Sequence, residues 1–251
     1  MHIALLATCL VDLFRPNAGF AAIALLENAG CVVDVPLGQT CCGQPAYNNG
    51  DVDSARKIAR QVIETFSDYE YVVVPSGSCA GMLIHHYPRL FEDDPDWHRK
   101  AMDLSGRCHE LVSFLHDILK VTSFPMQYHG SLTCHDSCSS LREIHAQQKS
   151  RNLLACNNKQ TLIELNDAEV CCGFGGTFCV KYSEISESMV NDKVANIDAT
   201  GAEILVSGDM GCLLNIAGRL KRLNRPIRIF HIAELLADMT DVPGIGDGAD
   251  E

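Results

Sequence analysis

The dipeptide Cys-Cys followed by glycine occurs twice in this chain of 251 residues, and this repeat constrains the fold more than any other feature. The first copy begins at Cys41, and the second begins at Cys171, 130 residues later. Self-similarity at one fixed spacing is typical of a duplicated structural unit. The repeat therefore predicts two related modules.

Single cysteines flank both copies in the same order. Cys9 precedes the first copy and corresponds to Cys138 at an offset of 129 residues, and Cys79 follows it and corresponds to Cys212 at an offset of 133 residues. Each module thus offers four cysteines. We predict two ligand sets, which are Cys9, Cys41, Cys42, Cys79 and Cys138, Cys171, Cys172, Cys212.

Cys134 is the alternative to Cys138 in the second set. In the first module 31 residues separate Cys9 from Cys41, whereas 32 separate Cys138 from Cys171 and 36 separate Cys134 from Cys171. The spacing therefore favours Cys138. Four other cysteines have no repeat counterpart, and we interpret them as small buried hydrophobes, with Cys179 alone close to a cluster loop; they are Cys31, Cys108, Cys156 and Cys179.

Two polar residues, His135 and Asp136, lie between Cys134 and Cys138. Two interpretations stay open for them. They tune a metal centre or relay protons beside it, or they make the hydrogen bonds of an ordinary turn.

The chain is long enough for two domains of about 110 to 130 residues each. We expect a first module over residues 1–122, a second over 123–240, and an acidic tail at 241–251 that is disordered. Short β-branched runs alternate with helical spacing of apolar residues, which predicts an α/β fold of two similar parallel-sheet modules. Residues 91–108 are predicted to be rich in loops. The strands are expected near 2–7, 31–36, 71–75, 130–134, 161–165, 203–207 and 227–231.

Composition excludes several classes of function. A formal net charge of -12 argues against nucleic acid as a partner, because such proteins present clustered Lys and Arg. No apolar run approaches the roughly 18 residues of a membrane span. The first ten residues lack a basic leader and are interpreted as a buried strand rather than a targeting segment, so we expect a cytoplasmic protein. Thirteen cysteines in such a protein indicate metal or redox chemistry rather than disulfides.

The predicted cysteine positions favour iron–sulfur chemistry. Cysteines that follow parallel strands meet at one edge of a sheet, where sites are built. Adjacent cysteines rarely reach one small tetrahedral ion, and zinc sites space their cysteine pairs by two or more residues. A cluster of several irons offers a separate corner to each thiolate. We therefore predict two iron–sulfur clusters of the 4Fe-4S type, with zinc and metal-free redox thiols as alternatives.

Four segments carry a family resemblance: residues 39–48, 76–79, 171–178 and 212–220. They resemble the CCG cysteine-rich domain family, which includes a cysteine-rich subunit of heterodisulfide reductase and the iron–sulfur subunit of glycolate oxidase. The resemblance covers about residues 2–238. In one respect the chain departs from the family, whose motif ends Cys-x-x-Cys, because Met82 and Asn215 occupy the last positions here. The choice between a cubane and a non-cubane cluster therefore stays open.

The resemblance also implies a function. Its closest point is with family members that act in lactate use, and it implies an iron–sulfur electron-transfer subunit of a multi-subunit complex that oxidises L-lactate to pyruvate. The implied partners are the other subunits, one of them a ferredoxin-like iron–sulfur protein. No flavin or nicotinamide fingerprint is present, so the chain alone is not expected to oxidise lactate. A heterodisulfide-reductase-like or glycolate-oxidase-type subunit, and a zinc-stabilised interaction scaffold, are the alternatives.

Overall fold

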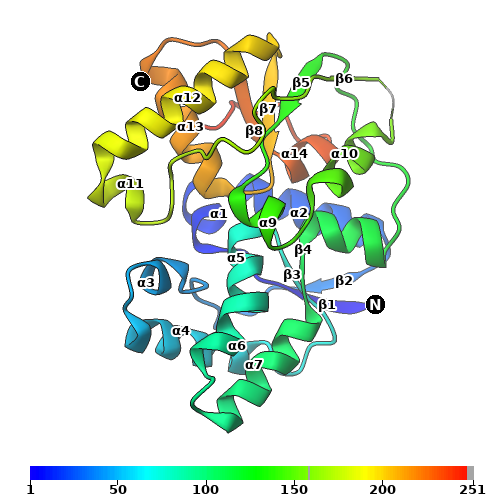
Figure 1. The fold of residues 1–251 in the computed structure, drawn as a ribbon. Coiled ribbons are helices and arrows are strands. Elements are labelled where there is room, and N and C mark those ends of the chain that lie inside the picture. The colour runs from blue at the N-terminus through cyan, green and yellow to red at the C-terminus, as the bar shows by residue number, and fades with distance from the viewer. Residues whose placement is uncertain (158, 248–251) are drawn as a thin grey trace.

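The computed structural model describes residues 1–157 and 159–247, and it contains two four-stranded parallel sheets (Figure 1). The first has the strand order β2-β1-β3-β4, and the second has the matching order β6-β5-β7-β8. The first sheet consists of β1 (His2–Leu5), β2 (Val32–Asp34), β3 (Val72–Val74) and β4 (Cys108–Glu110). The second consists of β5 (Ser131–Cys134), β6 (Thr161–Leu162), β7 (Ile204–Ser207) and β8 (Arg228–His231).

The two sheets are equivalent residue by residue where the first strand ends. The backbone N–H of Leu6 donates to the carbonyl of Val73, and the N–H of His135 donates to the carbonyl of Val206, both at 2.9 Å. These offsets of 129 and 133 residues are those of the flanking cysteines. The predicted α/β fold with an internal duplication is therefore confirmed.

Helices connect the strands of each sheet. In the first module they are α1 (Cys9–Phe14), α2 (Pro16–Asn28), α3 (Gln44–Asn48), α4 (Val52–Thr65), α5 (Gly77–Gly81), the π-helical segment η1 (Met82–His86), α6 (Tyr87–Leu90), α7 (Pro95–Arg107), α8 (Leu111–Ser113) and the π-helical segment η2 (Phe114–Ile118). In the second they are α9 (Cys138–Arg142), α10 (Gln147–Ala155), α11 (Phe178–Lys181), α12 (Ser183–Thr200), α13 (Met210–Arg222) and α14 (Ile232–Leu236).

The segment 91–108 is largely helical, so the prediction of a loop-rich stretch there is wrong. Asp94 caps α7, with its carboxylate accepting from the backbone N–H of Trp97 at 3.3 Å. Pro95 occupies the first turn, where its missing N–H costs nothing. The acidic residues and the proline that suggested a loop are therefore the start signal of a helix.

The modules share one hydrophobic core. Buried residues of β1, α2 and α8 pack in one cluster with buried residues of β5, β7, β8 and α14. Polar contacts reinforce this junction, because Glu234 is fully buried and accepts from the side chains of Arg15 at 2.8 Å and Asn17 at 2.7 Å. The predicted boundary at residues 122 and 123 stays a prediction, but the two units it separates do not have separate cores.

The helices α5 and α9 meet between the two sheets (Figure 1). Gly77 of α5 allows this approach, because a Cβ atom there would collide with the hydroxyl of Ser140. Since α5 carries Cys79 and α9 begins at Cys138, the contact holds the two predicted ligand sets near one another.

The described part of the acidic tail packs against the second module. Ile245 is buried, and its N–H donates to the carbonyl of Ile229 at 2.8 Å. This packing differs from the disorder expected for residues 241–247, while residues 248–251 lie outside the described residues. Within residues 1–157 and 159–247, none of the helices has the length and apolar character that crossing a membrane requires.

Candidate metal centres

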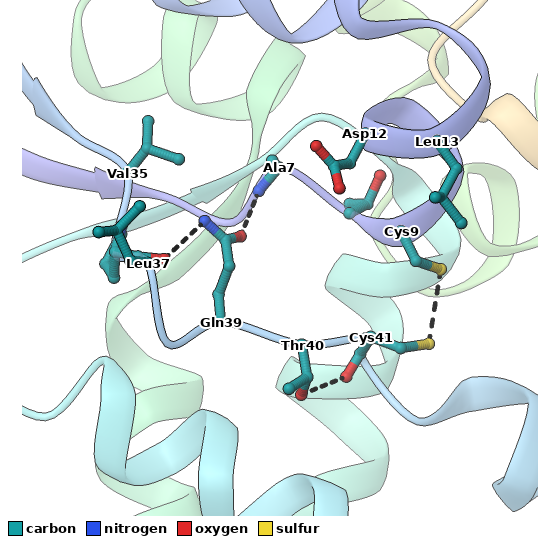
Figure 2. A pocket seen from close by; sticks show the side chains of 11 residues that line it. Ala7, Cys9, Asp12, Leu13, Val35, Leu37, Gln39, Thr40 and Cys41 are labelled. Atoms are coloured by element: carbon teal, nitrogen blue, oxygen red, sulfur yellow. Dashed lines mark hydrogen bonds between the residues drawn. The ribbon is translucent and has the colours of Figure 1, made fainter.

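The first cysteine set gathers at the carboxyl edge of the first sheet. Cys9 begins α1 directly after β1, Cys79 lies in α5 after β3, and Cys41 and Cys42 precede α3. The sulfur atoms of Cys9 and Cys41 are 3.6 Å apart, and those of Cys42 and Cys79 are 3.2 Å apart. Figure 2 shows the first of these pairs facing each other across a cavity. The duplicated spacing therefore brings together the four residues it singled out.

This cavity has a volume of about 420 Å³ and is lined by both half-buried cysteines, Cys9 and Cys41 (Figure 2). Gln39 holds one wall, because its amide accepts from the N–H of Ala7 at 2.8 Å and donates to the carbonyl of Pro36 at 3.1 Å. Leu13 and Leu37 lie on the rim and are largely exposed. The first set is thus reached from solvent through an apolar opening.

The second set repeats this arrangement with Cys138 and not with Cys134. Cys138 begins α9 and its thiol is hydrogen-bonded with the sulfur of Cys171, while the sulfurs of Cys172 and Cys212 are 2.9 Å apart. Cys134 instead packs in the shared core, where burial raises the pKa of its thiol to about 12. The structure therefore brings together the residues that the spacing favoured. Their role as ligands stays a prediction.

The cysteines without a repeat counterpart lie apart from both sets. Cys31 and Cys108 are buried in the apolar cores, as expected of small hydrophobes, whereas Cys156 and Cys179 are partly exposed. Cys179 contacts the carbonyl of Gly176 at 3.6 Å.

One cysteine of each set has the character of a thiolate. Hydrogen bonds from Cys42 and then Cys9 lower the pKa of Cys41, and bonds from Cys138 and then Cys172 lower that of Cys171. The following glycine adds a backbone N–H to each sulfur, at 3.5 Å from Gly43 and 3.4 Å from Gly173. This approach needs positive φ angles of 81° and 78°, which only glycine adopts without strain. The glycine of the repeat thus has a chemical task.

The backbone carbonyl of the second Cys of each motif has a different donor in the two modules. Tyr87 donates its hydroxyl to the carbonyl of Cys42 at 2.8 Å, whereas Asn215 donates its amide to that of Cys172 at 2.7 Å. Asn215 stands where the family motif has its last cysteine, and its counterpart Met82 is fully buried in the core. The sequence marked Asn215 only as a departure, and it contained no signal for Tyr87.

The two sets lie on opposite sides of one wall. A cavity of about 230 Å³ borders the first set and another of about 250 Å³ borders the second, and five residues line both of them. The wall is formed by Gln44, Ser78, Phe174, Gly176 and Asp209. Residues from both modules therefore separate the two sets.

The second set has polar neighbours. His135 is 2% exposed and burial lowers the pKa of its imidazole to about 3, so the ring is neutral. Lys193 is fully buried and donates to the carbonyls of Ala168 at 3.2 Å and Asp167 at 3.4 Å. Asp136 pairs with Arg151 at 2.5 Å, which agrees with an ordinary structural role, whereas His135 makes no such bond. No signal in the sequence pointed to Lys193.

The chain resembles known proteins over almost its entire length. It matches the cysteine-rich domain described as CCG over residues 3–84 and 132–217. It is 47% identical over 236 residues to the lactate utilization protein A of Bacillus cytotoxicus, which covers 94% of this chain and 98% of that relative. Relatives of the same name from Geobacillus kaustophilus and Bacillus cereus are 47% and 45% identical over the same shares of both chains. This chain belongs to the CCG cysteine-rich domain family.

Proposed function

We propose that the chain is an iron–sulfur electron-transfer subunit of a multi-subunit complex that oxidises L-lactate to pyruvate. The observation that carries this proposal is the gathering of four cysteines at the same edge of each of two duplicated sheets. The relatives named for lactate utilization support the choice of substrate.

The donor set fits an iron–sulfur cluster. The first cluster would be held by Cys9, Cys41, Cys42 and Cys79, and the second by Cys138, Cys171, Cys172 and Cys212. Such a cluster, when bound, takes up and releases single electrons. Adjacent cysteines such as Cys41 and Cys42 suit several iron corners better than one tetrahedral zinc ion.

The surrounding residues prepare each set for this task. The N–H groups of Gly43 and Gly173 point at sulfur atoms, and hydrogen bonds to sulfur adjust the potential of a cluster. Cys42, Cys79, Cys172 and Cys212 are buried, which limits access of water to that side of each set. The shared wall supports passage of electrons between the two sets within the chain.

Partner subunits complete the reaction. The sequence has no dinucleotide fingerprint, so the hydride or electron pair of lactate must be accepted elsewhere. The apolar rim of Leu13 and Leu37 beside Cys9 supports close approach of a partner, which on the family resemblance is a ferredoxin-like iron–sulfur protein.

Iron and acid-labile sulfide analysis of anaerobically purified protein tests the proposal. We expect a brown protein with iron and sulfide in both halves. Stoichiometric zinc without sulfide would favour the zinc-stabilised scaffold instead. Turnover of lactate by the isolated chain with an artificial electron acceptor would contradict the role of a subunit without its own substrate chemistry.

A further inference from the structure

The two cysteine sets differ in one buried side chain that faces them. Leu6 and His135 occupy equivalent positions, because their N–H groups make the same 2.9 Å bond to the neighbouring strand. Leu6 is fully buried and packs in the apolar cluster that contains Cys42 and Cys79. The second set therefore has an imidazole where the first has a hydrocarbon.

The imidazole of His135 has no hydrogen-bond partner among the described residues. Neither ring nitrogen is paired, although the residue is only 2% exposed. An unpaired buried polar group costs about 1–3 kcal/mol, and such groups need an explanation. The nearby charged groups do not provide one, because Asp136 pairs with Arg151 and Lys193 donates to backbone carbonyls.

The position of the ring supplies an explanation. One ligand atom each of His135, Cys172 and Cys212 lie within 4.8 Å of one another, and all three residues are buried. Metal–nitrogen and metal–sulfur bonds of about 2.0 and 2.3 Å place donors of a tetrahedral ion roughly 3.3 to 3.8 Å apart. Small side-chain rotations bring the three atoms to that spacing.

We propose that His135 is a nitrogen ligand of the metal centre held by the second cysteine set, giving that centre an imidazole donor that the first lacks. The inference rests on the proposed function only in requiring a metal centre there, and not in the kind of centre. It makes the two centres chemically unequal despite their common origin.

An imidazole donor also gives electron flow a direction. Neutral histidine in place of anionic thiolate raises the potential of an iron–sulfur cluster. One electron would then leave the first centre, which is oxidised, and reduce the second centre. His135→Leu, which restores the residue of the first module, should lower the potential of the second centre toward that of the first.

Pulsed electron paramagnetic resonance of the reconstituted protein labelled with ¹⁵N-histidine tests the ligand directly. A coordinated imidazole gives a strong nitrogen coupling, which we expect in the wild type and in the control His129→Leu, and not in His135→Leu. His129 is a suitable control because it is exposed. Two assembled clusters without that coupling in the wild type would overturn the inference and leave the proposed function standing.

Cobalt(II) titration of the metal-free protein decides the matter if no cluster assembles, an outcome that defeats the proposed function alone. We expect His135→Leu to bind cobalt at the second set about tenfold or more weakly than the wild type and His129→Leu. Equal affinity in all three proteins would overturn the inference.

A urea unfolding curve guards against a folding artefact. Metal-free His135→Leu should be at least as stable as the wild type, because leucine removes an unpaired polar group. Lower stability would show that the imidazole supports the fold and would count against a ligand role. His135→Asn, which is smaller and polar, is the reserve variant if the leucine protein does not fold.

Discussion

Asp209 accepts a hydrogen bond from the backbone N–H of Ser78, with 2.9 Å between Oδ2 and N. The first residue precedes α13 of the second module, and the second lies in α5 of the first. Asp209 is buried, and both residues belong to the wall between the two cysteine sets. This bond therefore fixes α5, which carries Cys79, relative to α13, which carries Cys212.

Asp209→Ala should lower the free energy of unfolding of the metal-free protein by about 1.5–3 kcal/mol, because it removes a buried hydrogen bond to a charged group. Asp209→Asn keeps an acceptor oxygen and should lose less. Urea denaturation of the three proteins measures the difference. An alanine variant as stable as the wild type would show that this contact does not hold the modules together.

Serine at any of the eight cysteines should remove metal mainly from its own module, because a set of four thiolates has no spare ligand. Cys138→Ser should therefore lower the iron content by about half, while Cys134→Ser should leave it unchanged. Iron content and electron paramagnetic resonance check this, with Cys31→Ser as a buried control. The reverse result would exchange the assignments of Cys134 and Cys138.

Alanine should be tolerated worse at Gly173 than at Gly43. Both glycines have left-handed backbones, which cost an alanine roughly 1–2 kcal/mol. At Gly173 the new Cβ would also lie 2.7 Å from the backbone oxygen of Ser186, whereas at Gly43 its nearest neighbour is a methyl group of Ile58 at 3.2 Å. Thermal unfolding of the two metal-free variants should show the larger loss for Gly173→Ala. Equal losses would mean that the chain around Gly173 relaxes freely.

Stability should fall as the pH drops below about 6.5, partly because of His231. Burial lowers the pKa of this fully buried imidazole, whose Nε2 donates to the carbonyl of Pro75 at 3.1 Å. The unfolded chain takes up a proton at about pH 6.5, before the folded protein does. The contribution of His231 is thus complete above that pH and is lost as the pH falls further.

The variant His231→Asn tests this assignment, because asparagine can still cap α14. Its urea midpoint should change less between pH 7 and pH 5 than the midpoint of the wild type. His129→Asn, at an exposed position, should keep the wild-type slope. An unchanged slope in His231→Asn would assign the pH dependence to other groups, such as His109, whose pKa burial also lowers.

Much of the fold was predictable because seven of the eight described strands are short apolar or β-branched runs. The exception is β4, whose residues 108–110 are Cys-His-Glu and take strand form by pairing with β3. A segment of three such residues has no alternation that distinguishes it from the start of a helix. The helix α7 was missed for a related reason, because its acidic start and proline are signals common to loops and to helix caps.

The candidate site was predictable to the extent that the repeat encodes it. Eight cysteines share spacing, and residues after parallel strands must meet at one edge. Tyr87 and Lys193 were not predictable, because each reaches its set only through tertiary packing. Tyr87 arrives through the helical stretch after Cys79, and Lys193 from the middle of α12.

The shared core has a consequence for the history of the chain. A single module of this kind would expose the apolar face that the other half now covers, so an ancestor with one module would have needed a second identical copy on that face. In such a pair every substitution appears twice. Joining the copies in one polypeptide released that symmetry, and the contrast between Leu6 and His135 is a divergence that identical subunits would not have allowed.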